Sequence, residues 1–211
     1  MALAQRNFPR GPPNSVEIDG GSGGNQFNVQ SLPPAGTAVG LNGGSGTNTL
    51  DYSQYVGDIT VNLRLGTATG FTGGISNIQN VTGSQGNDLI VGDANANVLV
   101  GGAGRNIIIG GGGDNILIGG TTLWDANAAA LQAIMQEWTN TSVAFDQRVN
   151  ALRMGIVVNG QTYALNRSTV MGDSSPDSLI GGGGQNWFFF DKGDMIDNGA
   201  GPASTDRVTR V

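Results

Sequence analysis

The chain has 211 residues, among them 37 glycines, no cysteine and no histidine, and its formal net charge is −6. The missing residue types exclude disulfides, thiol nucleophiles, serine–histidine pairs and the usual zinc ligands. The acidic balance leaves no basic patch to neutralise phosphates, so no binding of nucleic acid is expected.

The N-terminal sequence MALAQRNFPRGPPNSV lacks the continuous apolar core of a secretory signal peptide. No stretch of the chain reaches the length of a transmembrane helix, so we expect no membrane insertion. The chain is therefore either intracellular or exported without a cleaved N-terminal signal.

Residues 1–15 contain three prolines and little apolar periodicity, which predicts an extended N-terminal arm. Such an arm is either a frayed terminus or a segment that docks on a neighbouring copy. From residue 16 a nine-residue pattern appears in degraded form, with units that start at Gly20 and Gly43. Short β-branched runs between residues 52 and 82 alternate with threonine, asparagine and glycine, and they predict short strands and turns.

Residues 83–118 form the regular centre of the chain, because they repeat every nine residues without a gap. Each unit starts with a glycine-rich half and ends with an apolar half. The sixth place is Asp or Asn in every unit and the eighth place is aliphatic: Asp88, Asn97, Asn106 and Asn115, then Ile90, Leu99, Ile108 and Leu117. The glycine-rich half predicts a tight turn and the apolar half a short strand whose central side chain points inward. Two units make one coil, so Asp88 is expected over Asn106 and Asn97 over Asn115.

Residues 121–171 follow a different pattern. Apolar residues at helical spacing predict one helix over residues 121–138 and a second from about Ser142, with Thr122 or Asp125 as the N-cap of the first. Asn159-Gly160 between two alternating runs predicts a β-hairpin. We therefore expect a β-roll over residues 16–120, a helical hairpin plus β-hairpin inserted over residues 121–171, and a resumed coil and tail over residues 172–211, with Asp177 and Asn186 at the sixth places.

The repeated units resemble the haemolysin-type calcium-binding (RTX) nonapeptide GGxGxDxUx, in which U is a large apolar residue. The chain is similar to the C-terminal region of large bacterial RTX surface proteins. The resemblance implies a parallel β-roll or β-solenoid, Ca²⁺ between stacked turns, an extracellular or cell-surface location and type I secretion.

The expected calcium ligands lie in the stacked turns, where oxygen atoms meet. They are Gly83, Gln85, Asp88, Gly101, Ala103 and Asn106, then Asn97 and Asn115, Asp177 and Asn186, with Asp93 and Asp114 as compensating carboxylates at other turn places. Asn supplies an oxygen but no charge, so these sites are expected to bind Ca²⁺ more weakly than Asp-rich repeats. The alternative is that stacked Asn side chains form amide ladders without metal.

The seventh and ninth places of the four regular units are all aliphatic, and they flank the inward residue: Leu89, Val91, Val98, Val100, Ile107, Ile109, Ile116 and Ile118. Strands that are apolar on both faces belong to sheets buried on both faces. The helical hairpin can cover one sheet, so the other sheet requires the N-terminal segments or another subunit. Uncapped ends of the roll would also stack copies end to end.

These features favour a non-enzymatic extracellular structural protein that self-assembles as a filament or surface layer, or that acts as a matrix or adhesion scaffold. The alternative is a secretion and folding module of a larger type I-secreted enzyme or toxin. Enzymatic activity is the weakest interpretation: Asp191, Asp194 and Asp197 fit a solvated or calcium-linked turn better than a glycosidase pair. Trp187 and the three phenylalanines after it fit core packing better than a carbohydrate platform.

Overall fold

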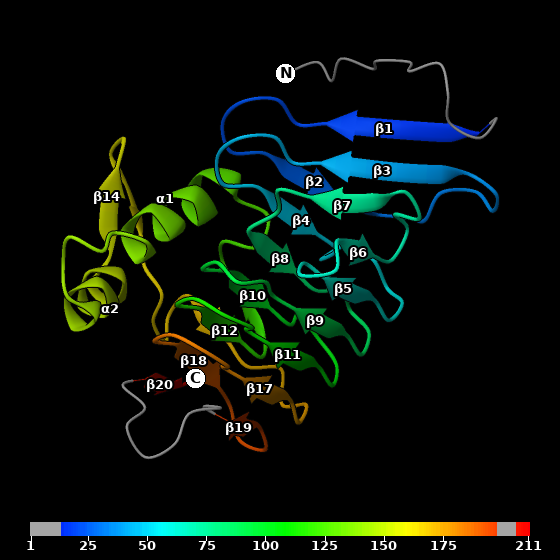
Figure 1. Cartoon of the computed structure of the whole chain (residues 1–211). Coiled ribbons are helices and arrows are strands. Elements are labelled where there is room, and N and C mark those ends of the chain that lie inside the picture. Colours follow the sequence, from blue (N-terminus) through cyan, green and yellow to red (C-terminus); the bar gives the residue numbers. More distant parts are fainter. Residues whose placement is uncertain (1–13, 198–205) are drawn as a thin grey trace.

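The computed structural model describes residues 14–197 and 206–211. Most of the arm predicted over residues 1–15, and part of the C-terminal tail, lie outside the described residues. The described part is built mostly from short β-strands with two α-helices, which confirms the predicted mainly β class (Figure 1).

One sheet, here called the covered sheet, has the strand order β2-β4-β8-β10-β12-β18-β20, and all its pairs are parallel. Its strands are β2 (Gln26–Asn28), β4 (Thr49–Asp51), β8 (Asn80–Thr82), β10 (Val98–Val100), β12 (Ile116–Ile118), β18 (Trp187–Phe190) and β20 (Arg207–Arg210).

A second sheet, here called the open sheet, has the order β19-β17-β11-β9-β5-β6. Its strands are β5 (Thr60–Asn62), β6 (Thr67–Ala68), β9 (Leu89–Val91), β11 (Ile107–Ile109), β17 (Ser178–Ile180) and β19 (Met195–Asp197). Only the β5–β6 pair at its edge is antiparallel.

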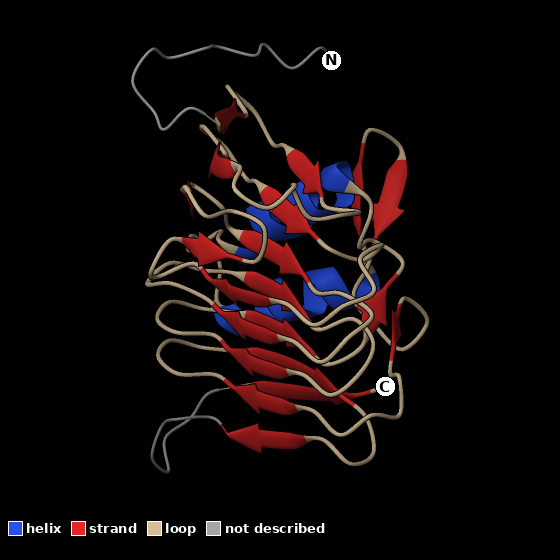
Figure 2. Cartoon of the chain, turned by 90° about the vertical axis from the view of Figure 1, so that its right-hand side faces the viewer, coloured by secondary structure: helices blue, strands red, loops and turns tan. Residues whose placement is uncertain are grey.

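From β8 onward the chain visits the two sheets in turn, and Figure 2 shows the strands stacked one above another with turns on both sides. The backbone N–H of Asp88 donates to the side chain of Asn106, 18 residues further on, as expected for coils of two units. The eighth-place side chains of both sheets fill one shared core, in which Ile90, Leu99, Ile108 and Leu117 are fully buried. A further parallel sheet, β1 (Ser15–Asp19), β3 (Ala38–Asn42) and β7 (Gly74–Ser76), extends the stack at its N-terminal end.

The insertion leaves and re-enters the stack between β12 and β17. β13 (Thr121–Thr122) pairs antiparallel with β16 (Val170–Met171) at its base. α1 (Ala128–Trp138) and α2 (Phe145–Met154) follow, and β14 (Ile156–Val158) and β15 (Gln161–Tyr163) form the hairpin predicted at Asn159-Gly160. Both turn residues have positive φ, 51° and 78°, as this hairpin turn requires.

The predicted N-cap of α1 was wrong. Asn127 caps the helix, because its Oδ1 accepts a hydrogen bond from Ala130 N at 3.0 Å. The Thr122 amide and hydroxyl instead donate to the Asp125 carboxylate, which closes a turn before the helix.

The helices lie against the outer face of the covered sheet (Figure 1). Val98, Val100, Ile116 and Ile118 are at most 1 % exposed, because they pack against α1, α2 and Trp187. The equivalent residues of the open sheet stay partly accessible, and Ile107 is 45 % exposed. The insertion thus covers one sheet and leaves the outer face of the other without a cover among the described residues.

Candidate calcium-binding turns

The sixth-place residues line up in two rows, one along the turns before each sheet. Before the open sheet, Asp88 N donates to Asn106 Oδ1 at 3.0 Å, Asn106 N to Asp177 Oδ1 at 2.7 Å, and Asp177 N to Asp194 Oδ1 at 2.9 Å. Before the covered sheet, Asn97 N donates to Asn115 Oδ1, Asn115 N to Asn186 Oδ1 and Asn186 N to Asp206 Oδ1. In both rows the backbone of one coil is thus tied to the sixth-place side chain of the next coil.

The amide hydrogens of the asparagines point back into their own turns. Asn115 Nδ2 donates to Gly112 O at 3.0 Å and to Gly113 O at 3.1 Å, and Asn106 Nδ2 donates to Gly104 O at 3.1 Å. Gly104 and Gly113 have φ of 83° and 69°, which helps to turn these carbonyl groups toward the side chain. Asn186 and Asn48 make the same kind of contact, to Gly183 O and to Gly46 O.

These amide groups occupy the position that a cation requires. The orientation of each amide is fixed because its oxygen receives the backbone hydrogen of the neighbouring coil, which leaves only the –NH₂ group facing the turn carbonyls. A cation needs oxygen atoms without a donor, and these carbonyl groups already accept hydrogen bonds. The donor set of the asparagine turns does not fit Ca²⁺.

The turn at Asn97 is closed in a slightly different way. The amide of Asn97 donates to Gln79 O at 3.0 Å, and its oxygen accepts from Asp93 N at 2.9 Å. Asp93 closes the same turn, since its carboxylate accepts from the backbone and the side chain of Asn95. This turn too is satisfied by the chain's own groups.

Asp88 is a buried carboxylate whose oxygens are both engaged. Its Oδ2 accepts from Ser84 N at 2.6 Å, and its Oδ1 accepts from Ile59 N at 2.9 Å and from the Ser84 hydroxyl at 2.7 Å. Burial raises the pKa of Asp88, while the hydrogen bonds from Ser84 and Ile59 lower it. Ser84 thus supplies the hydrogen-bond donors that close this turn, as the asparagine amides do in other turns.

The remaining predicted turn ligands take part in hydrogen bonds between or within the coils, and they do not bring several oxygen atoms to one point. Gly83, Gly101 and Gln85 donate their backbone hydrogens to Val100, Ile118 and Tyr55, and Ala103 O accepts from Asn106 Nδ2 at 3.4 Å. Among residues 14–197 and 206–211, no three acidic, histidine or cysteine side chains form a ready-made metal cage. A cation here would need backbone oxygens as well as carboxylates.

The two turns at the C-terminal end of the open sheet differ from all of these. Asp177 is 3 % exposed, and its Oδ2 is sealed from solvent without a hydrogen-bond donor. Asp173 Oδ2 and Asp191 Oδ1 are buried without a donor in the same two turns. Burial raises the pKa of Asp177 to about 7, against the hydrogen bond from Asn106 N, and the charges of Asp194, Asp173 and Asp191 raise it further. Buried carboxylate oxygens without a donor are ligands that suit Ca²⁺.

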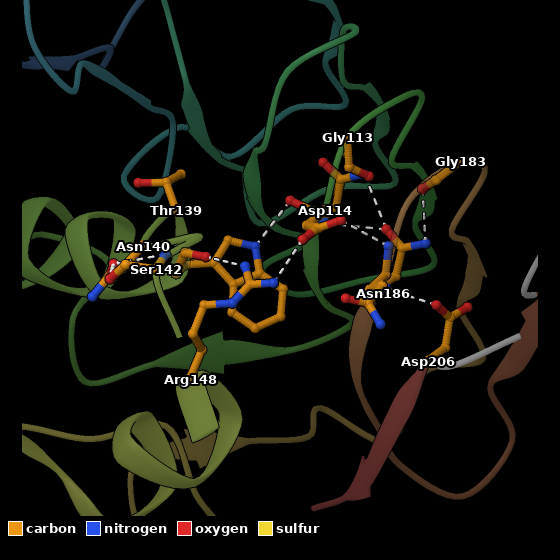
Figure 3. Close-up of polar contacts among 12 residues, drawn as sticks. Gly113, Asp114, Thr139, Asn140, Ser142, Arg148, Gly183, Asn186 and Asp206 are labelled. Atoms are coloured by element: carbon orange, nitrogen blue, oxygen red, sulfur yellow. Dashed lines mark hydrogen bonds and ion pairs between the residues drawn. The ribbon is translucent and has the colours of Figure 1, made fainter. Parts of the chain in front are cut away.

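Asp114 faces the insertion, not a cation. Its Oδ2 lies 3.0 Å from Arg148 Nη2, and its Oδ1 accepts from Gln185 N at 2.8 Å. Figure 3 shows Arg148 reaching from α2 toward Asp114, beside the turn that holds Asn186 and Gly183. Sequence reasoning missed Arg148, although Phe145, Val149 and Leu152 at helical spacing place it on the buried face of α2.

The repeated turns match a known protein family. A family model of the RTX calcium-binding nonapeptide repeat matches residues 74–104, 91–121 and 168–194. The matched segments contain the regular units and the two turns with unpaired carboxylates. A search of the curated proteins found no match.

Proposed function

Because its regular coils are RTX calcium-binding nonapeptide repeats, we propose that this chain is a non-enzymatic, extracellular, calcium-binding β-roll that assembles with copies of itself. RTX repeats are typical of secreted proteins. Neither helix in the described residues has the length and apolar composition that a membrane span requires. The proposed export route is type I secretion without a cleaved N-terminal signal.

The assembly proposal rests on the difference in burial between the outer faces of the two sheets. The outer face of the open sheet presents an aliphatic stripe, here called the open stripe: Leu89, Val91, Ile107, Ile109 and Ile180. No described helix or strand packs on it, whereas the equivalent residues of the covered sheet are buried under the helices. An exposed aliphatic patch of this kind on a soluble protein marks an interaction surface.

A second copy of the chain is the occupant that fits the open stripe best. The stripe contains no charged side chain, and Asp197, which pairs in register with Ile180, lies only at its C-terminal end, so two copies can face each other over β9 and β11 without burying a charge. Sheets pack face to face at about 10 Å with their side chains interdigitated. Burial of the partly exposed aliphatic side chains would contribute about 5 kcal/mol per copy.

The ends of the stack support growth beyond a dimer. β1, β2 and β19 are edge strands of their sheets in the described part of the chain, and edge strands with free backbone groups pair with other chains. Face-to-face pairing together with end-to-end pairing would give a filament or a layer, and either form could serve as a matrix or adhesion scaffold.

Two hollows of the described surface lack paired carboxylates. One hollow of about 640 Å³ is lined by Arg153, Arg167 and Arg210, and another of about 600 Å³ by apolar residues that include Leu32 and Phe71. Neither contains a pair of carboxylates. Asp194 accepts hydrogen bonds from Asp177 N and Asp191 N, which suits a structural turn.

Sedimentation and electron microscopy of the purified chain, with calcium and with chelator, test the proposal. Ile107→Lys together with Ile109→Lys should abolish assembly, because each charge would be buried in the contact. Val157→Lys is the matched control, since Val157 is 69 % exposed on the β14–β15 hairpin and outside the open stripe. A wild-type chain that stays monomeric under all conditions would favour the alternative, a folding module of a larger secreted enzyme or toxin.

A further inference from the structure

In the two rows of sixth-place residues, one turn lacks a hydrogen-bond donor at its centre. At the other turns of the regular units, the turn centre is filled by a donor of the chain itself. The donor is the amide of Asn106 or Asn115, the backbone N–H of Asp93 at Asn97, or the backbone and hydroxyl of Ser84 at Asp88. At Asp177 the same position lacks a donor, because Oδ1 accepts from Asn106 N while the buried Oδ2 has no partner.

The unpartnered oxygen of Asp177 points toward the next carboxylate of the row. A Cβ atom built on Gly119 would lie 2.5 Å from Asp177 Oδ2 and 3.1 Å from Asp194 Oδ2. Both oxygens therefore lie close to Gly119, and Asp194 Oδ2 also accepts a hydrogen bond from Asp191 N at 2.8 Å. The first-place glycines of other coils come equally close to their sixth-place side chains, since a Cβ atom on Gly83 would lie 2.6 Å from Asp88 Oδ2. The missing donor, not the spacing, therefore distinguishes Asp177 from Asp88.

Negative charge is concentrated at this end of the stack without compensation inside it. Asp173, Asp177, Asp191 and Asp194 lie in the turns 172–177 and 191–194, which precede β17 and β19 at the C-terminal end of the open sheet (Figure 1). Lys192 is the single cation of these two turns, and it is exposed. Burying carboxylates in this way is costly unless a cation joins them.

From these observations we infer that Ca²⁺ binds at the turn pair 172–177 and 191–194, with Asp177 as its central ligand, while the asparagine turns are closed by the chain's own donors and take no ion. Asp173 and Asp191 each offer a further buried oxygen without a donor, and Asp194, whose oxygens both accept backbone hydrogen bonds, contributes charge. The ion would join the last two coils of the open sheet, and the coils before them would hold their shape without metal. The inference rests on the proposed calcium-binding function and does not depend on assembly.

Calcium titration of the full chain by calorimetry, after treatment with chelator, tests the inference. The wild-type chain should bind about one ion, not one per turn. Asp177→Asn together with Asp194→Asn should lower the affinity at least about tenfold. Asp88→Asn is the matched control, because Asp88 is an equally buried sixth-place carboxylate with both oxygens engaged, and the affinity of this variant should stay within about twofold of the wild-type value.

A second pair of variants changes no charge. Gly119→Ala places a methyl group between the two carboxylate oxygens and should lower the affinity at least about tenfold, whereas Gly183→Ala meets no atom closer than 3.7 Å and should leave it unchanged. The far-ultraviolet circular dichroism of each variant shows that it is folded before titration.

The outcomes separate the two proposals. If the wild-type chain binds Ca²⁺ and both the Asp177/Asp194 and Gly119 variants bind equally well, the assigned location is wrong and the calcium-binding function stands. Binding that is lost equally in Asp88→Asn, or a stoichiometry that matches the number of turns, also contradicts the location. A folded wild-type chain that binds no Ca²⁺ overturns both.

Discussion

Arg148 and Asp114 form an ion pair between the insertion and the stack, with Arg148 Nη2 3.0 Å from Asp114 Oδ2. The guanidinium also donates to Trp138 O, and it lies over the rings of Trp138 and Phe145. The Arg148 side chain is 5 % exposed, so the pair is largely shielded from solvent. This contact fixes α2 to the turn that precedes β12.

We predict that Arg148→Ala destabilises the chain by about 3 kcal/mol, because it leaves the Asp114 carboxylate and the Trp138 carbonyl without their buried donor. Urea unfolding, monitored by tryptophan fluorescence, measures the change. Arg105→Ala removes an exposed arginine of the stack and serves as the control. Equal unfolding midpoints for the two variants would show that the ion pair does not hold the insertion.

Trp138 provides the second contact of the insertion. It is fully buried, stacks on Trp187 with ring centres 6.2 Å apart, and donates from Nε1 to Asp114 O. Trp138→Ala should cost about 4 kcal/mol and open the outer face of the covered sheet to solvent. Increased binding of a hydrophobic dye would report this opening. Leu123→Ala, at a residue 58 % exposed, should change neither stability nor dye binding.

The amide ladder should stabilise the coils without metal. Asn115→Ala removes the acceptor of Asn97 N and the donor to Gly112 O and Gly113 O, all of them in one pair of stacked turns. We expect a loss of about 3 kcal/mol that is the same in calcium and in chelator. Asn150→Ala, at an exposed residue of α2 outside the stacked turns, is the control. A loss that calcium restores would mean that Asn115 acts as a calcium ligand.

The stability of the chain should depend on pH through Asp125. Burial raises the pKa of Asp125 to about 6 although the Thr122 hydrogen bonds oppose the shift, and the pKa of an unfolded aspartate is about 3.9. The folded state therefore binds a proton more tightly, so this group makes the free energy of unfolding rise by about 3 kcal/mol as the pH falls from about 7 to about 4. Asp125→Asn should remove this contribution. An unchanged slope of stability against pH in the variant would contradict it.

The regular half of the fold was predictable because each of its units contains the same local signals. Glycines set the turns, the aliphatic eighth places set the inward faces, and the fixed period places Asp88 beside Asn106, as the structure confirms. The hairpin at Asn159-Gly160 and the apolar stripe of α1 are also local signals, and both are confirmed.

The rest depended on contacts between distant segments. The N-terminal pairs β1–β3 and β3–β7 span unequal lengths of chain, so no period revealed the additional sheet. The ion pair of Arg148 with Asp114 joins residues 34 positions apart. The sixth-place pattern predicted which residues stack, but the direction of each amide depends on which neighbouring backbone hydrogen its oxygen accepts, and the sequence pattern does not contain that information.

Hydrogen exchange of the full chain in calcium and in excess chelator tests the central claim most directly. Removing calcium should leave the backbone amides of residues 83–118 protected, because amides and Ser84 close those turns, and should reduce protection only around residues 172–197, where the carboxylates lose their cation. Loss of protection over both segments together would contradict the account, since it would show that calcium holds every coil.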